Sequence, residues 1–285
     1  MTRDVQMAYE ECRRITRGAG SSFYAGMQVL PAERRQAIFA VYALARRIDD
    51  IADGALPPDT KLTRLGEVRA ALRSSGESRD PVVVAVADAA SRYPIPLDAF
   101  DDLVDGAEAD ARGRRYETFA DLEWYCRCVA GSIGRLALGV FLTDERQRAE
   151  RFADDLGVAL QLGNILRDLG EDLRQGRAYL PATDLERFGC RIAGDRLAGD
   201  AELLVAFEAQ RGLGWLERGL QLVPLVDRRS GCSVMGMAGP YRRLLERIAT
   251  NPGLALRGRV SLPRWEKRWA FMRGVAEVAA RGAAA

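Results

Sequence analysis

The sequence contains no histidine, and this absence excludes several kinds of active site. Ser-His-Asp and Cys-His catalysis, imidazole acid–base chemistry and histidine-ligated zinc or iron all require that side chain. The five cysteines include no C-x-x-C pair, so neither a structural zinc site nor a disulfide framework is expected. A reducing, cytoplasmic setting fits this cysteine usage best.

A strong excess of charge of one sign is also missing. Lys and Arg total 42 against 40 Asp and Glu, and a net charge of +2 predicts no nucleic-acid partner. The start, "MTRDVQMAYEECRR", is too acidic for a secretory signal, and no window approaches the roughly eighteen apolar residues of a membrane span. We therefore expect a soluble or peripheral protein without an obvious basic amphipathic anchor.

The 285 residues are 48% hydrophobic, which is ample for a buried core. Apolar residues recur at spacings of three and four, and alternating patterns are nearly absent, which predicts an all-α protein. No linker or repeat interrupts the chain, so one domain over residues 1–285 is expected. The predicted helices cover residues 8–18, 32–53, 61–74, 81–92, 97–112, 118–141, 145–174, 201–226, 232–250 and 262–280, with loops at "GALPPDT", "RSSGESRD", "YPIP", "GRAYLPATD" and "TNPGLALRG".

One acidic motif ends the helix predicted over 32–53. Ile38, Tyr42, Ala45, Asp49 and Asp53 follow one another at steps of three or four, so both aspartates continue a stripe of core-type residues. We predict that this stripe faces inward.

A second motif lies in "LQLGNILRDLGED". Gly157, Gln161, Asn164, Asp168 and Asp172 form a polar line at spacings of three and four, with apolar residues on both sides. A solvated helix face is normally broad, whereas this one is narrow. The sequence therefore predicts a polar slot in an apolar surface.

Exposed ion pairs are the alternative explanation for acids at spacing four among arginines, and for either motif alone the two explanations are about equally good. Two such motifs favour a shared cation, because buried carboxylates without positive partners are strongly unfavourable. Oxygen ligands from Asp and Asn suit Mg²⁺, which also binds substrate phosphates. Arginines near both motifs would complete a diphosphate clamp, although Arg47 is readily explained as a surface residue; these are Arg46, Arg47, Arg167, Arg174 and Arg177.

The segments "YALARRIDDIAD" and "LQLGNILRDLGEDLRQGRAYLP" resemble the paired aspartate-rich signatures of the squalene/phytoene synthase family, the head-to-head trans-isoprenyl diphosphate synthases. Further similarity lies in "GSSFYAGMQVLPAERRQAIFAVYA", "YCRCVAGSIG" and "YRRLLERI", and the resemblance spans about residues 8–270. It implies a single-domain, all-α isoprenoid synthase bundle around a central cavity, where Mg²⁺ bridges two prenyl diphosphates to aspartates.

The same resemblance implies roles for particular residues. Asp49, Asp53, Asp168 and Asp172 would be catalytic metal ligands, with Asn164 as a further ligand or partner. The substrate-binding residues would be Ser22, Phe23, Tyr42, Arg46, Gln161, Arg167, Tyr179 and Tyr241. Ordinary core packing would explain the three aromatic residues Phe23, Tyr42 and Tyr241 without the resemblance, and Ser22 would then be a helix cap.

Departures from the family pattern bear on the product. Arg127 stands where a tyrosine is common, and Gly163 replaces a frequent threonine, features that look most like bacterial presqualene diphosphate synthases of hopanoid pathways. The first expectation is therefore Mg²⁺-dependent condensation of two farnesyl diphosphates to presqualene diphosphate. The alternatives are squalene formation with NADPH, phytoene formation from geranylgeranyl diphosphate, or a non-catalytic helical scaffold.

The resemblance also implies partners. Prenyl diphosphates would be the substrates, and enzymes of a hopanoid or carotenoid pathway would take the product. A very greasy product is compatible with peripheral membrane contact.

Overall fold

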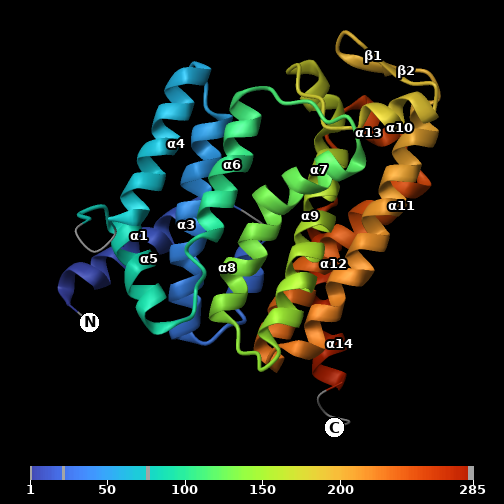
Figure 1. Ribbon diagram of the computed structural model, residues 1–285. Coiled ribbons are helices and arrows are strands. Elements are labelled where there is room, and N and C mark those ends of the chain that lie inside the picture. The colour runs from blue at the N-terminus through green and yellow to red at the C-terminus, as the bar shows by residue number, and fades with distance from the viewer. Residues whose placement is uncertain (1, 21–22, 75–77, 282–285) are drawn as a thin grey trace.

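The computed structural model describes residues 2–20, 23–74 and 78–281, and it is almost entirely helical (Figure 1). The all-α prediction is therefore confirmed. The helices are α1 (Arg3–Gly18), α2 (Phe23–Met27), α3 (Ala32–Asp53), α4 (Pro58–Arg73), α5 (Pro81–Arg92), α6 (Ala99–Ala111), α7 (Phe119–Cys126), α8 (Ser132–Val140), α9 (Arg146–Arg174), α10 (Ala182–Arg187), α11 (Ala201–Gly219), α12 (Arg228–Thr250), α13 (Gly253–Arg257) and α14 (Arg264–Arg281). A π-helical turn, η2 (Arg127–Gly131), joins α7 to α8, and a 3-10 turn, η3 (Leu220–Leu225), follows α11.

The long helices agree closely with the sequence predictions, and α3 has the predicted bounds. The segment predicted as one helix over 118–141 is continuous but contains the π turn η2. The expected loop "TNPGLALRG" was wrong in part, because it contains α13. An antiparallel hairpin of β1 (Arg191–Ala193) and β2 (Arg196–Ala198) was not predicted. Elements of three to six residues are too short to display a helical or strand period.

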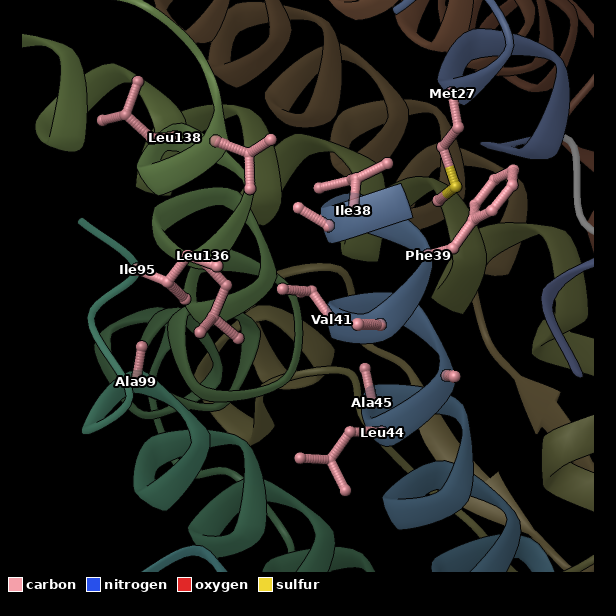
Figure 2. Close-up of a cluster of buried hydrophobic side chains, with 14 of the residues drawn as sticks. Met27, Ile38, Phe39, Val41, Leu44, Ala45, Ile95, Ala99, Leu136 and Leu138 are labelled. Atoms are coloured by element: carbon pink, nitrogen blue, oxygen red, sulfur yellow. The ribbon is translucent and has the colours of Figure 1, made fainter. Parts of the chain in front are cut away.

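Two hydrophobic clusters hold the bundle together. One lies among α1, α3, α5, α6 and α8, at the left of Figure 1, and the other lies among α9, α11, α12 and α13 at the right. In Figure 2, Val41 and Leu44 of α3 point toward Leu136 of α8, whereas Phe39 turns toward Met27 of α2.

Helix α9 belongs to both clusters. Residues of its first half, such as Leu156, pack in the first cluster, and Leu162, Ile165 and Leu169 pack in the second. Helix α9 is therefore packed on several sides, and this packing fixes the rotation of the helix about its axis. The rotation in turn fixes where the polar side chains Gln161, Asn164, Asp168 and Asp172 point.

Gly157 has a packing role rather than the place in the polar line that its spacing suggested. A Cβ at this position would lie 2.4 Å from the Gly131 nitrogen of η2, closer than real side chains approach. Glycine thus allows the backbones of α9 and η2 to touch, which sets the depth of α9 in the bundle.

All five cysteines are buried and free of disulfides, and buried thiols of this kind pack as small hydrophobic side chains. None of the helices within the described ranges combines the length and apolar character needed to cross a bilayer. The boundaries of a single domain over residues 1–285 stay a prediction.

Candidate active site

Arg177 connects the two acidic motifs. Its Nη1 donates a hydrogen bond of 2.8 Å to Asp53 Oδ1 at the end of α3, and its Nε lies 3.4 Å from Asp172 Oδ1 on α9. A single guanidinium therefore spans the distance between motifs that are more than a hundred residues apart in the sequence. The ends of α3 and α9 face each other, with a cation between their carboxylates.

The two motifs differ in exposure. The side chains of Asp49 and Asp53 are 56% and 54% exposed, whereas those of Asp168 and Asp172 are 19% and 15% exposed. The inward stripe predicted for α3 is correct at Ile38 and Ala45, which are buried, but it opens to solvent at the aspartates. The first motif is therefore reachable from solution, and the second lies deeper.

Several carboxylates here resist ionisation. Burial among protein atoms, followed by the nearby charge of Asp53, raises the pKa of Asp49 to about 6. Burial also raises the pKa of Asp172 to about 6, although Arg177 partly opposes this shift. A cation bound beside these acids would oppose both shifts, because a nearby positive charge favours the ionised form of a carboxyl group.

The donor set fits Mg²⁺, because aspartate and amide oxygens are the ligands this ion takes. Within the described residues, no group of three or more acidic or cysteine side chains is close enough to hold an ion by itself. Magnesium commonly binds through one or two carboxylates and completes its shell with water and phosphate oxygens. The residues present therefore suit an ion that arrives with a diphosphate.

Hydrogen bonds order the polar line of α9. Asn164 Nδ2 donates to Gln161 Oε1 at 3.1 Å, and Asn164 Oδ1 accepts from Arg167 at 2.9 Å and from the Tyr241 hydroxyl at 2.9 Å. Arg167 also pairs with Asp168 at 2.5 Å. The amide and the guanidinium are thereby held in defined orientations beside the acids.

Aromatic rings extend this line toward the other side of the bundle. Phe23 of α2 stacks on Tyr241 of α12, with ring centroids 5.9 Å apart and planes 12° apart. Tyr42 is half-buried and packs against the first hydrophobic cluster. Ser22, also predicted in this group, lies outside the described residues.

A side chain at Gly163 would disturb Tyr241. A Cβ there would lie 2.9 Å from the Tyr241 ring carbon Cδ1. Because α9 has no side chain at this point, the ring can lie close against the helix and reach Asn164.

Several arginines surround the acids. Arg46 lies 3.3 Å from Asp49 and 2.5 Å from Asp50, on the same helix. Arg47 is half-buried and instead pairs with Asp80, the residue that caps α5.

A small pocket adjoins Arg167, a residue that the sequence analysis placed at the diphosphates. Arg259 Nε is 3.3 Å from Asp168 Oδ1, and the pocket, of about 100 Å³, lies where this arginine, Arg167 and Tyr241 meet Leu262 and Lys267. Sequence reasoning missed Arg259, because it follows a glycine-rich turn without any acidic periodicity.

A buried acid was also missed. Asp110 of α6 accepts hydrogen bonds from the Tyr125 hydroxyl at 2.7 Å and from the Tyr179 hydroxyl at 3.0 Å. Burial raises the pKa of Asp110 to about 6, although the two hydroxyl groups act in the opposite direction. Tyr116 packs on both of these tyrosine rings, at centroid distances of 5.3 and 6.3 Å. The predicted site residue Tyr179 is thus one of three clustered phenols.

Arg127, which stands where the family pattern commonly has a tyrosine, lies in an ion-pair network. It contacts Glu123 at 2.9 Å, Asp155 at 3.2 Å and Asp154 at 3.5 Å, and it lies over the Trp215 ring. These partners belong to α7, α9 and α11. Its replacement of a tyrosine therefore has a structural explanation, while Tyr125 supplies a phenol that contacts Asp110.

A family model described as squalene/phytoene synthase matches residues 16–266. The chain belongs to the squalene/phytoene synthase family. It is 43% identical to a phytoene synthase of Mycobacterium tuberculosis, over 91% of this chain and 87% of that one.

Solved structures of this family agree with the fold. A dehydrosqualene synthase bound to a ligand superimposes with a TM-score of 0.84 at 28% identity, covering 99% of this chain and 98% of the other. A squalene synthase from Alicyclobacillus acidocaldarius gives a TM-score of 0.78 at 28% identity, covering 88% and 96%. The helical isoprenoid synthase fold expected from the resemblance is confirmed, and the central cavity stays a prediction.

Proposed function

We propose that this member of the squalene/phytoene synthase family joins two geranylgeranyl diphosphates head to head and completes the reaction to phytoene. The observation that carries the proposed chemistry is the bridge from Asp53 through Arg177 to Asp172, which brings both acidic motifs within reach of one diphosphate. Similarity to phytoene synthases supports the C20 substrate.

In the first half-reaction, one allylic diphosphate ionises and the double bond of the second substrate attacks the resulting cation. Loss of a proton then closes a cyclopropane. Mg²⁺, when bound with substrate, would stabilise the negative charge of the departing diphosphate. Asp49, Asp53, Asp168 and Asp172 would hold it, with Asn164 beside them.

The remaining residues bind and orient the substrates. Arg46 and Arg167 are placed among the acids, and guanidinium groups match phosphate oxygens in a bidentate manner. Gln161 holds the Asn164 amide in position. Each substrate diphosphate would thus bind positively charged guanidinium groups and hydrogen-bond donors whose positions are already fixed.

Aromatic side chains would protect the cation. The stacked pair of Phe23 and Tyr241 and the tyrosine cluster around Tyr179 would supply the aromatic surface, because ring faces attract positive charge and exclude water. Tyr42 and Ser22 stay predictions as residues that line the substrate chain.

Presqualene diphosphate formation from farnesyl diphosphate is the second candidate. The structural similarity to a dehydrosqualene synthase and to a squalene synthase favours a C15 substrate. NADPH would be needed only if squalene were the product. A cytoplasmic location, peripheral membrane contact and transfer of the product to hopanoid or carotenoid enzymes stay predictions.

One experiment separates these candidates. Purified protein is incubated with Mg²⁺ and either C15 or C20 diphosphate, without NADPH, and the products are identified by mass spectrometry. Phytoene from the C20 substrate is expected, whereas presqualene diphosphate from the C15 substrate alone would replace the first candidate by the second.

A non-catalytic scaffold is tested by substitution of one acid in each motif. Asp49→Ala and Asp168→Ala are expected to abolish turnover, and Glu67→Ala, which changes an exposed acid on α4, is the matched control. Full turnover in both motif variants would contradict the proposed chemistry.

A further inference from the structure

The outward face of α14 carries three large apolar side chains. Trp265, Trp269 and Met272 are 70%, 52% and 62% exposed. Their spacings of four and three place them on one side of the helix, and Ala276, also exposed, continues the same line. Large apolar residues exposed together in this way mark a surface that contacts another phase or molecule.

The opposite face of α14 fixes this orientation. Glu266 is buried and accepts hydrogen bonds from Arg243 at 2.7 Å and Arg247 at 2.5 Å, both on α12. A Cβ at Gly274 would lie 2.4 Å from the Met235 carbonyl oxygen, so the two helices are in backbone contact there. Rotating the tryptophans inward would break a buried ion-pair network, which is costly.

Basic side chains flank the apolar line. Arg264 and Arg268 are exposed on one side of it, and neither has an ion-pair partner among the described residues. On the other side, Arg273 lies over the Trp269 ring at 5.4 Å and pairs with Glu277. Tryptophan between arginines is the composition of helices that lie in the headgroup region of membranes.

The start of α14 also borders the candidate site. The segment that leads into α14 contributes Arg259 and Leu262 to the pocket that reaches Arg167 and Tyr241, and Lys267 of α14 completes its wall. Docking through α14 would therefore act on an element that also forms part of the pocket wall.

We propose that α14 docks the protein on a membrane surface that contains anionic phospholipid, with Trp265, Trp269 and Met272 in the headgroup region and Arg264 and Arg268 near lipid phosphates. This goes beyond the proposed reaction and does not depend on it. This face is not evident from the sequence, because three apolar residues among charged ones give α14 little overall hydrophobicity. Their common face becomes evident once the buried side of α14 is known.

Vesicle flotation without substrate tests the proposal. The full chain is mixed with phosphatidylcholine vesicles with or without phosphatidylglycerol, and Trp fluorescence is recorded in parallel. Binding to the anionic vesicles, with a blue shift and weakening at high salt, is expected. Trp265→Ser with Trp269→Ser should weaken binding at least about tenfold. Arg264→Ala with Arg268→Ala should weaken it by about fivefold per arginine.

Two controls make the test specific. Trp124→Ser removes an exposed tryptophan of α7, and Arg13→Ala with Arg17→Ala removes exposed charge from α1; neither should change binding. Unaltered thermal unfolding of each variant shows that it is folded.

Three results would overturn the proposal. The first is no binding to anionic vesicles, and the second is binding that survives both α14 variants. The third is a dimer that the tryptophan variant converts to a monomer, because the face would then join two copies of this chain. Vesicle binding is measured without turnover, so its failure leaves the proposed reaction untouched.

Discussion

Replacing Arg177 by alanine tests whether the two acidic motifs depend on a shared cation. The substitution leaves Asp53 and Asp172 facing each other without the guanidinium that now lies between them. Because Arg177 lowers the pKa of Asp172, its removal should raise that pKa above its present value of about 6. The variant should therefore be less stable wherever Asp172 is ionised.

The size of the effect follows from the exposure of each partner. The Asp53 side chain is 54% exposed, so its ion pair should contribute at most about 1 kcal/mol. Asp172 is only 15% exposed, and leaving a mostly buried polar group without its partner costs about 1–3 kcal/mol. We expect a loss of about 2 kcal/mol in the free energy of unfolding at pH 7.5.

The pH dependence has a definite sign. A carboxylate whose folded pKa is raised from 3.8 to about 6 takes up a proton in the folded protein as the pH falls through 6. Once Asp172 is neutral, the Arg177 guanidinium no longer has a negative charge on that residue to stabilise. The difference between wild type and Arg177→Ala should therefore be largest above pH 6 and fall to a few tenths of a kcal/mol near pH 5, as for a surface pair.

Urea unfolding at both pH values provides the measurement. Arg174→Ala, which removes an exposed arginine from the last position of α9, is the control and should lower the free energy of unfolding by less than about 0.5 kcal/mol. Added Mg²⁺ should restore part of the loss in Arg177→Ala, since a second cation can then neutralise the acids. An equal loss at both pH values, or an equal loss in the control, would refute the reasoning.

Three further predictions concern the site and its support. Asp168→Asn, which keeps the shape but removes the charge, should lower kcat/KM for prenyl diphosphates about 100-fold or more in steady-state assays with Mg²⁺. Tyr125→Phe should cost about 1 kcal/mol in urea unfolding because it removes the hydrogen bond to the buried acid, whereas Tyr116→Phe should be neutral or stabilising because that hydroxyl has no hydrogen-bond partner among the described residues. Asp227→Asn leaves the buried Arg34 without its carboxylate and should cost about 3 kcal/mol of unfolding free energy at pH 7. Burial alone would raise the pKa of Asp227, but hydrogen bonds, that from Arg34 first, and the Arg34 charge together outweigh it and hold that pKa below its usual value, so the cost should shrink below pH 4. An unchanged cost at pH 3 would contradict this.

The long helices were predictable because their apolar periodicity extends over many turns. Helix α3 shows this well, since Pro31 precedes its first residue and Gly54 follows its last. The spacing of Asp168 and Asp172 likewise fixed their common side of α9 without any knowledge of the partner helices.

Contacts between distant segments were not predictable from local pattern. Asp110 became a candidate only when Tyr125 and Tyr179, 15 and 69 residues further along the chain, were seen to donate to it. Arg177 was noted as a basic neighbour of the second motif, but its bond to Asp53 crosses 124 residues. The chain's tertiary packing, rather than any one helix, decides such partners.

The missing side chain at Gly163 constrains how this protein can diverge. A threonine here, as the family resemblance suggests for other members, would push the Tyr241 ring outward by contact with Cδ1. The ring would then lose its stacking on Phe23 and its reach to Asn164 unless α12 moved as well. Exchange of this one glycine is therefore coupled to the position of the Tyr241 ring, so a compensating change around Tyr241 would have to accompany it.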